Sequence, residues 1–167
     1  DLMLTVFGKY YQQKTFKMDP LLTPIGGQNQ KNNKKTTGYG FAISYRLSKK
    51  ITLLNSVEKA VRMPSENEIF GSPGENIVEN FGIKPEVSNN LNLGIKLGPF
   101  RNQDHKYAFA VSGFLRDTKD KIVRRINPRL NDAVQTDPFE NLGKTMSIGF
   151  ETEASYSLKN NLKFGIN

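Results

Sequence analysis

The chain of 167 residues is long enough for one domain, but only 37% of its residues are hydrophobic and its mean hydropathy is −0.54. No segment approaches the roughly 18 consecutive apolar residues of a membrane-spanning helix, and the absence of cysteine excludes disulfide bonds and thiolate metal sites. The net charge of +8 would suit nucleic-acid binding if the basic residues formed one patch, but they are scattered. Their densest cluster, Lys31, Lys34 and Lys35, is predicted to be a solvated loop, so we expect no nucleic-acid partner.

The first predicted strands show a period of two. After a less regular strand over Leu4–Met18, large apolar residues take the odd positions from 39 to 47, and small or polar residues take the even positions. The two sets are Tyr39, Phe41, Ile43, Tyr45 and Leu47 against Gly40, Ala42, Ser44 and Arg46. Because successive side chains of a strand point to opposite faces, this pattern predicts a strand with one apolar and one polar face.

The same alternation recurs over Val87–Leu97 and Met146–Leu158, and less regular strands are predicted over Ile51–Met63, Tyr107–Ile126 and Leu162–Ile166. About seven strands result. The polar faces of their central parts carry charged and amide residues: Arg46, Asn92, Lys96, Arg116, Glu151 and Glu153. All prolines are expected in connections or at strand edges, because proline cannot donate to a central ladder.

The connections alternate between two lengths. Short polar links are predicted at 48–50, 99–106 and 159–161, and long ones at 19–35, 65–86 and 127–142. Outer-membrane barrels have tight turns on one side of the membrane and long loops on the other, whereas soluble β-sandwiches mix lengths less regularly. We therefore predict a single partial domain over 1–167. Its expected fold is all-β, an antiparallel up-and-down meander of about seven strands that forms part of a large transmembrane β-barrel.

Tyrosines support the prediction that the apolar face meets lipid. Tyr45, Tyr107 and Tyr156 each lie near a predicted short turn, on the apolar face of a strand. A tyrosine there keeps its ring in hydrocarbon and its hydroxyl among headgroups. We interpret the three together as membrane-interface aromatics, although any one of them alone fits the edge of an ordinary core.

Three sequence blocks resemble the C-terminal half of the barrel of TonB-dependent receptors. The first runs from Val61 to Gly71 and the second from Asn80 to Gly94, with a Lys-Pro-Glu sequence at its centre. The third, 141–156, contains a Gly-x-Glu-x-Glu pattern. Between the second and third blocks, 114–122 resembles the strand that follows the second block in that family. The positions that carry the resemblance are Arg62, Pro64, Glu68, Phe70, Gly71, Lys84, Pro85, Glu86, Gly149, Glu151 and Glu153.

The resemblance implies an outer-membrane receptor of a Gram-negative bacterium that imports a scarce nutrient, such as an iron chelate, cobalamin or a glycan. It also implies a plug domain, further barrel strands and a TonB-type energy-transducing partner that acts through an N-terminal region. None of these is visible in the sequence, and the chain stops within a predicted strand at Asn167, so we expect a fragment. Ligand capture is assigned to the loops 19–35, 65–86 and 127–142.

Two other hypotheses are weaker. A soluble β-sandwich or adhesin-like binding module would share the alternation, with the apolar face packed on a second sheet. Catalysis and metal binding lack support, because His105 is the only histidine and no Gly-x-Ser-x-Gly elbow occurs. His105 is predicted to be a surface residue in a short turn. We therefore expect no catalytic residues, no metal site and no cofactor. Gly149 is expected to leave space beside Glu151, whose carboxylate pairs with an arginine of the polar face or stays solvated.

Overall fold

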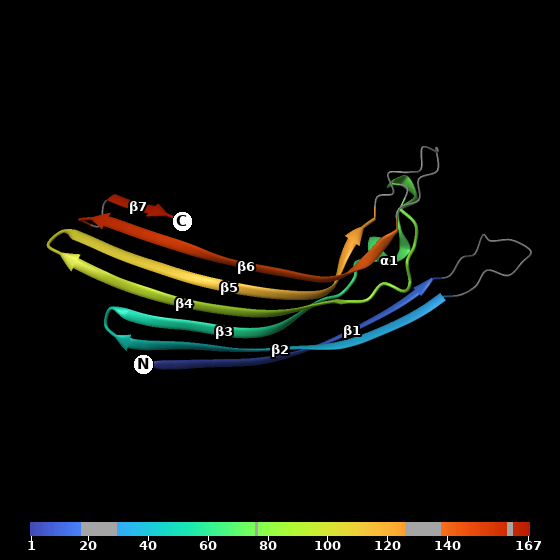
Figure 1. Ribbon diagram of the computed structural model, residues 1–167, viewed down its shortest axis with the longest axis horizontal. Helices are drawn as coiled ribbons and strands as arrows, with labels where there is room; N and C mark the ends of the chain where they lie inside the picture. The colour runs from blue at the N-terminus through green and yellow to red at the C-terminus, as the bar shows by residue number, and fades with distance from the viewer. Residues whose placement is uncertain (18–29, 76, 126–137, 160–161) are drawn as a thin grey trace, which may run out of the picture.

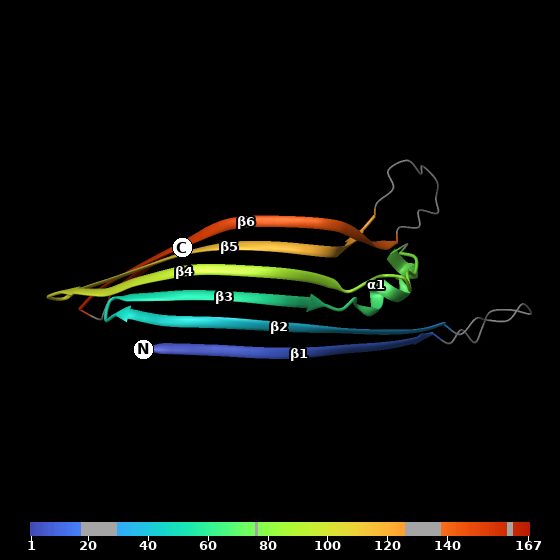
Figure 2. The same ribbon diagram turned by 60° about the horizontal axis from the view of Figure 1, so that its bottom comes forward.

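The computed structural model describes residues 1–17, 30–75, 77–125, 138–159 and 162–167, and the strands among them form one antiparallel sheet. Its strands follow one another in chain order, each paired with the next (Figures 1 and 2). Their bounds are β1 Leu2–Lys17, β2 Gln30–Ser48, β3 Ile51–Arg62, β4 Glu86–Asn102, β5 His105–Arg124, β6 Phe139–Leu158 and β7 Leu162–Ile166. The predicted meander of seven strands is confirmed.

The sheet is a long, curved wall with two unlike ends. The turn between β2 and β3 and the turn between β4 and β5 lie at one end, which we call the turn end. The connection from β3 to β4 lies at the opposite, loop end and contains the helix α1 (Glu66–Phe70) and the 3-10 turn η1 (Pro73–Glu75) (Figure 1). The predicted asymmetry of the connections is therefore seen in the residues that the structure describes.

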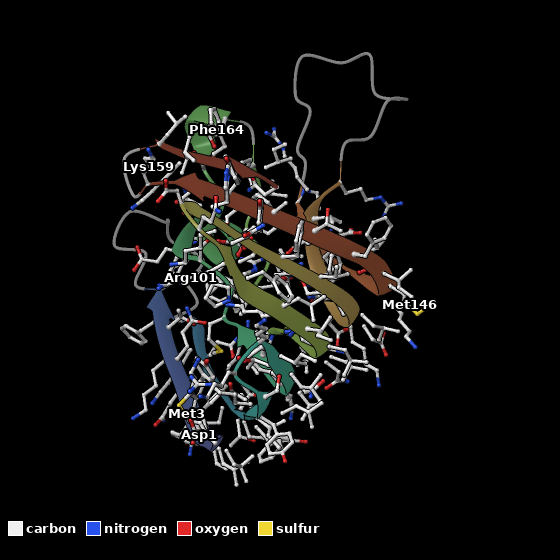
Figure 3. The ribbon with its side chains drawn as sticks, turned by 90° about the vertical axis from the view of Figure 1, so that its left-hand side faces the viewer. Asp1, Met3, Arg101, Met146, Lys159 and Phe164 are labelled. Atoms are coloured by element: carbon white, nitrogen blue, oxygen red, sulfur yellow. The ribbon has the colours of Figure 1, made fainter. Side chains whose placement is uncertain are left out.

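The two faces differ as the period of two predicts. On the outer face, Phe150 and Ile148 of β6 are each 78% exposed, and Met146 of β6 points away from the curved wall when it is viewed along the strands (Figure 3). Register places large apolar residues of neighbouring strands on the same face, for example Ile148 opposite Leu115. The concave face carries the small and polar set, including Asn92, whose Nδ2 donates to Oγ of Ser56 at 3.0 Å.

Several strands extend further than predicted. β2 begins at Gln30 and pairs with β1 up to Lys17, so Lys31, Lys34 and Lys35 lie in a strand and the prediction of a loop there is wrong. β4 ends at Asn102 and β5 begins at His105, so the turn between them consists of Gln103 and Asp104 alone. β6 begins at Phe139, earlier than predicted. Backbone pairing accounts for this, because ladder hydrogen bonds do not require apolar side chains. Sequence periodicity fades where both faces become polar.

Pro99 lies inside β4, not in a connection as predicted. The pairing of β4 with β5 shifts its register between Leu97 and Phe100, so the position is irregular and no ladder donor is needed from the proline.

The prediction for His105 is also corrected. It is the first residue of β5, and its Nδ1 lies 2.8 Å from the hydroxyl of Tyr156.

Candidate functional site

The connection between β3 and β4 folds back over the concave face at the loop end. We call residues 63–75 and 77–85 the brace. Ser65 caps α1: Glu68 N donates to its Oγ, and its own N–H donates to Oε2 of Glu68 at 2.7 Å, which completes a capping box. Gly71 ends the helix with φ +72°, and a Cβ there would stand 2.3 Å from the carbonyl oxygen of Ile77. The brace therefore begins with a short, firmly capped turn.

One arginine joins the two ends of the brace. Nη1 of Arg62, at the end of β3, donates to both carboxylate oxygens of Glu68 at 3.1 and 3.0 Å, and Nη2 donates to Oε1 of Glu86 at 2.9 Å. Oε1 of Glu86 also accepts from the backbone N–H of Ile122 in β5 at 2.6 Å. The arginine thus binds the brace to its entering and leaving strands, and Glu86 extends the network to a third strand.

These contacts lower the pKa of both carboxyl groups. Burial opposes ionisation of Glu68, but the hydrogen bonds from Arg62 and Ser65 outweigh it, so its pKa lies below the ordinary value. For Glu86 the hydrogen bond from Arg62 is the largest cause, and it also leaves the pKa lowered. Both groups are therefore carboxylates at neutral pH, which is the form that a guanidinium binds best.

Polar side chains from β1, β2 and β6 hold the main chain of the brace. From β1 and β2, Gln13 donates to the carbonyl oxygen of Pro64 at 2.9 Å, and Asn32 donates to that of Phe81 at 2.5 Å. Lys34 donates to the carbonyl oxygen of Ile83. From the other side, Asn141 of β6 accepts from the backbone N–H of Lys84 at 2.7 Å and donates to its carbonyl oxygen at 2.9 Å. The brace therefore spans the concave face from β1 to β6.

A small apolar cluster lies under the brace. Ile69 of α1 and Ile83 are both 0% exposed, and Ile122 of β5 is 7% exposed. Phe70 packs edge-on against Phe81 with ring centroids 5.5 Å apart. Among the described residues, these buried isoleucines form the core cluster of the molecule, which places the best-packed region at the loop end and not in the wall.

The structure brings together eight of the predicted motif positions. Arg62 and Glu86 flank the brace, and the others lie within it: Pro64, Glu68, Phe70, Gly71, Lys84 and Pro85. Pro64 is fully buried and its carbonyl oxygen accepts from Gln13. The resemblance named these positions without a role, and their geometry here is that of a folded, anchored segment.

The remaining three motif positions lie on the concave wall of β6. Gly149 is opposite Phe114 of β5, and a Cβ at this glycine would stand 2.6 Å from the ring. The expected space beside Glu151 is therefore filled by Phe114. Glu151 and Glu153 are exposed and, within the described residues, neither forms an ion pair with an arginine, so pairing with an arginine of the lumen stays a prediction. They line an open trough with Asn92, Ser112 and Lys96 and with apolar residues such as Met3 and Leu54.

The three tyrosines lie on the outer face near the turn end. Tyr107 and Tyr156 are directly opposite each other, with stacked rings whose centroids are 5.5 Å apart. Phe164 of β7 and His105 stack on the same group, and Tyr45 lies on the outer face of β2, 42% exposed. The structure adds two stacking partners to the predicted pair: His105, whose ring stacks on both tyrosines, and Phe164, which stacks on Tyr156. That these rings lie at a membrane interface stays a prediction.

The predicted capture loops have different outcomes. Of the predicted loop 65–86, residues 65–75 and 77–85 lie in the brace and Glu86 begins β4, whereas 30–35 and 139–142 belong to β2 and β6. The rest of 19–35 and of 127–142, except Pro138, lies outside the described residues. In the described part of the chain, no group of three or more His, Cys, Asp or Glu has metal-binding geometry, and no helix is long and apolar enough to cross a membrane.

Sequence analysis missed the residues that anchor the brace. Gln13, Asn32, Lys34 and Asn141 contact it from 49 to 57 positions away in the chain. The only local signal was the presence of amide side chains in strands, where they are otherwise uncommon.

Comparison with known proteins agrees with this geometry. A family model described as TonB dependent receptor-like, beta-barrel matches residues 2–167. No curated protein matches the sequence. Among solved structures, the hemophore receptor HasR of Serratia marcescens, in complex with its hemophore HasA and heme, is 15% identical with a TM-score of 0.62. That match covers 93% of this chain and 27% of the receptor.

Two further structures are similar. The FrpB iron transporter from Neisseria meningitidis is 20% identical with a TM-score of 0.66, over 93% of this chain and 21% of that one. The copper transporter OprC is 19% identical with a TM-score of 0.66, over 97% of this chain and 24% of that one. At these identities the likeness concerns the fold, and the chain spans about a quarter of the length of each. The meander, its two unlike faces and the family match over 2–167 identify this chain as a member of the TonB-dependent receptor-like β-barrel family.

Proposed function

We propose that this chain forms part of the wall of an outer-membrane receptor that imports a scarce nutrient into a Gram-negative bacterium. The observation that carries the proposal is the asymmetric wall, apolar and exposed on its outer face, polar on its concave face, and closed at the loop end by the anchored brace. An exposed apolar face of this extent is costly in water and favourable in lipid. In the complete receptor it would face the bilayer.

We propose that the nutrient is an iron chelate, cobalamin or a glycan. Such nutrients are too scarce for passive diffusion across the outer membrane to supply the cell. Similar structures include receptors or transporters named for heme, iron, enterobactin and copper, which favours a metal-containing cargo. No enzymatic step is proposed. The receptor binds and translocates its cargo, and a TonB-type protein supplies the energy through an N-terminal region.

The concave trough is the proposed contact for a plug domain. Its lining mixes polar residues such as Asn92 and Ser112 with apolar ones such as Met3 and Leu54, and it leaves Glu151 and Glu153 exposed with no ion pair in the described part of the chain. Unpaired carboxylates on a concave wall favour a partner that brings basic or hydrogen-bonding groups. The remaining barrel strands would pair with the outer edge of β1 and with β7 and close the wall.

A soluble β-sandwich is a poorer candidate, because the described strands form one sheet and no second sheet covers the apolar face. An adhesin-like module would need that face to be covered by another partner.

A spin-label experiment tests the proposal in the complete receptor, reconstituted in bilayers. Because this chain contains no cysteine, single cysteines can be placed at the adjacent positions Phe150 and Glu151. A nitroxide at Phe150→Cys should be relaxed by oxygen, which concentrates in lipid, and one at Glu151→Cys by a water-soluble nickel chelate. Equal accessibility of both positions to the nickel chelate would show that the outer face does not meet lipid.

Uptake is tested in cells. Accumulation of radiolabelled ferric chelates, cobalamin and oligosaccharides should depend on the receptor gene and on the energy-transducing protein for one cargo class. Accumulation that persists without the energy-transducing protein would contradict active import.

A further inference from the structure

Lysines are concentrated on the outer face of the wall at its loop end. Register sets their face: Lys31 lies opposite Phe16, and Lys119 lies opposite both Val87 and Lys144, all on the apolar side of the sheet. The outer-face lysines of this end are Lys14, Lys31, Lys35, Lys59, Lys119, Lys121 and Lys144. They form two groups, one on β1 and β2 and one on β5 and β6, with Lys59 between them.

Acidic residues do not balance this charge. On the same face and end, the described residues include two acids, Asp117 and Glu140. Asp117 pairs with Lys144 at 3.1 Å, and Glu140 pairs with Arg125 at 3.3 Å. The other outer-face lysines form no ion pair within the described part of the chain. Lys119 stands directly opposite Lys144, and such like-charged pairs are unfavourable unless an anion lies between them.

The turn end has the opposite arrangement. Its outer face carries the stacked rings of Tyr107, Tyr156 and Phe164. Basic residues near this end lie on the concave face, as Lys106 does opposite Ser157 and Lys163 does opposite the same serine, or they lie in the turns. The concentration of lysine on the outer face is therefore a property of the loop end, and a generally basic composition does not explain it.

The spacing matches the thickness of a membrane. On β5, Tyr107 and Lys119 lie on the same face twelve residues apart, and on β6 so do Tyr156 and Lys144. At about 3.4 Å per residue and a strand tilt of about 40°, twelve residues rise about 31 Å, close to the hydrocarbon thickness of a bilayer. If the tyrosines lie at one interface, the ammonium groups lie among the headgroups of the other leaflet. The long alkyl chain of lysine can lie along the hydrocarbon while its ammonium group reaches the headgroups.

We propose that these lysine groups bind phosphate-bearing headgroups of the lipid leaflet at the loop end. The inference rests on the proposed function, because it requires the outer face to meet a bilayer. Lys119, Lys121 and Lys144 form the group with the clearest geometry. Their three ammonium groups lie on two paired strands, Asp117 pairs with Lys144, and Glu86 interacts with the charge of Lys121 without forming an ion pair with it. Lys14, Lys31 and Lys35 form the second group.

The test uses the complete receptor in phosphatidylcholine vesicles with and without diphosphorylated lipid A. The variant K119Q/K121Q/K144Q removes one group. The matched control K9Q/K96Q/K163Q removes the same charge from the concave face. Affinity for lipid A, measured by native mass spectrometry and by titration, should fall about fivefold per outer-face lysine, or about a hundredfold for three. The control should bind lipid A like the unaltered receptor.

Two results would overturn the inference: unchanged lipid A affinity in the outer-face variant, or an equal loss in the control. Inorganic phosphate at the same phosphate concentration should not displace the lipid, and displacement would contradict a lipid headgroup as the occupant. A nitroxide at Phe150→Cys in the same vesicles separates the two proposals. If it reports water, the proposed function fails, whereas oxygen access with unchanged lipid A binding overturns the lysine inference alone.

Discussion

Arg62 and Glu68 are six residues apart, and the guanidinium of Arg62 donates to both carboxylate oxygens of Glu68 at 3.0 to 3.1 Å. The side chain of Glu68 is 12% exposed, so the carboxylate has few alternative partners in water. Replacing Arg62 with alanine leaves this carboxylate without its cationic partner, and the backbone N–H of Ser65 remains as a donor to it. A bidentate contact between a strand end and a helix thus holds the entry to the brace.

We expect Arg62→Ala to lower the free energy of local opening of the brace by about 2 kcal/mol, because a partly buried charge loses its partner. Hydrogen–deuterium exchange of the amides of 66–70 should become about thirtyfold faster. The exchange rate in Arg62→Lys should lie between those of the unaltered chain and Arg62→Ala, since lysine keeps the charge but cannot make the bidentate contact. Arg46→Ala is the control, because its ion pair with Asp1 is solvent-exposed. Equal exchange in Arg62→Ala and Arg46→Ala would contradict the role of the arginine.

The acid response of the brace follows from its lowered pKa values. A carboxyl group whose folded-state pKa is depressed contributes stability above its unfolded pKa, and that contribution is lost as the pH falls through the folded-state value. For Glu68 and Glu86 both values lie below the ordinary 4.5. Protection of the brace should therefore be constant from neutral pH down to about 5 and should fall below about 4.5. Exchange measured at several pH values and corrected for intrinsic rates tests this, and loss between pH 6 and 7 would disagree with it.

Gly149 should resist substitution because of the aromatic ring of Phe114 opposite it. A Cβ there would stand 2.6 Å from Cζ of Phe114, so the ring must move. Gly149→Ala should destabilise the folded wall by about 1–2 kcal/mol, measured by urea unfolding in detergent. Gly143→Ala on the same strand is the control, since no atom lies within 4 Å of its Cβ position. A second change, Phe114→Leu, should recover part of the loss, and its failure to do so would point to a cause other than the ring.

Charge on the outer face should be costly at mid-membrane. Phe150 lies midway along β6 between Tyr156 and Lys144, and is 78% exposed. Phe150→Lys should make folding into bilayers less favourable by about 2–4 kcal/mol. Glu151→Lys, one residue away on the concave face, should change it by much less. If both variants cost the same, the face does not meet lipid.

The strands could be predicted from the sequence because alternation is local. The faces of Phe41, Leu93 and Phe150 follow from their neighbours two positions away, and the structure confirms all seven strands. Strand ends could not be predicted as well. Lys31 to Lys35 lie in β2 because β1 pairs with them, and pairing adds backbone hydrogen bonds that leave no mark on composition.

The brace could be predicted only as a set of motif positions. Arg62, Glu68 and Glu86 were named as a resemblance, but the anchors Asn32, Lys34 and Asn141 were not. Those contacts join residues about fifty positions apart, and they exist only when the wall curves enough to bring β1, β2, β5 and β6 around the same segment.

The sequence by itself determined the two faces of the wall, the order of its strands and the difference between its ends, because each depends on side chains a few positions apart. Only the tertiary structure decided that 65–86 is an anchored brace, that Phe114 fills the space at Gly149, and that the lysines gather on one face. These features depend on register between strands. The alternation excludes a shift of one residue, which would move every side chain to the other face. A shift of two residues keeps the faces but changes which residues lie opposite each other, so periodicity alone cannot set the register.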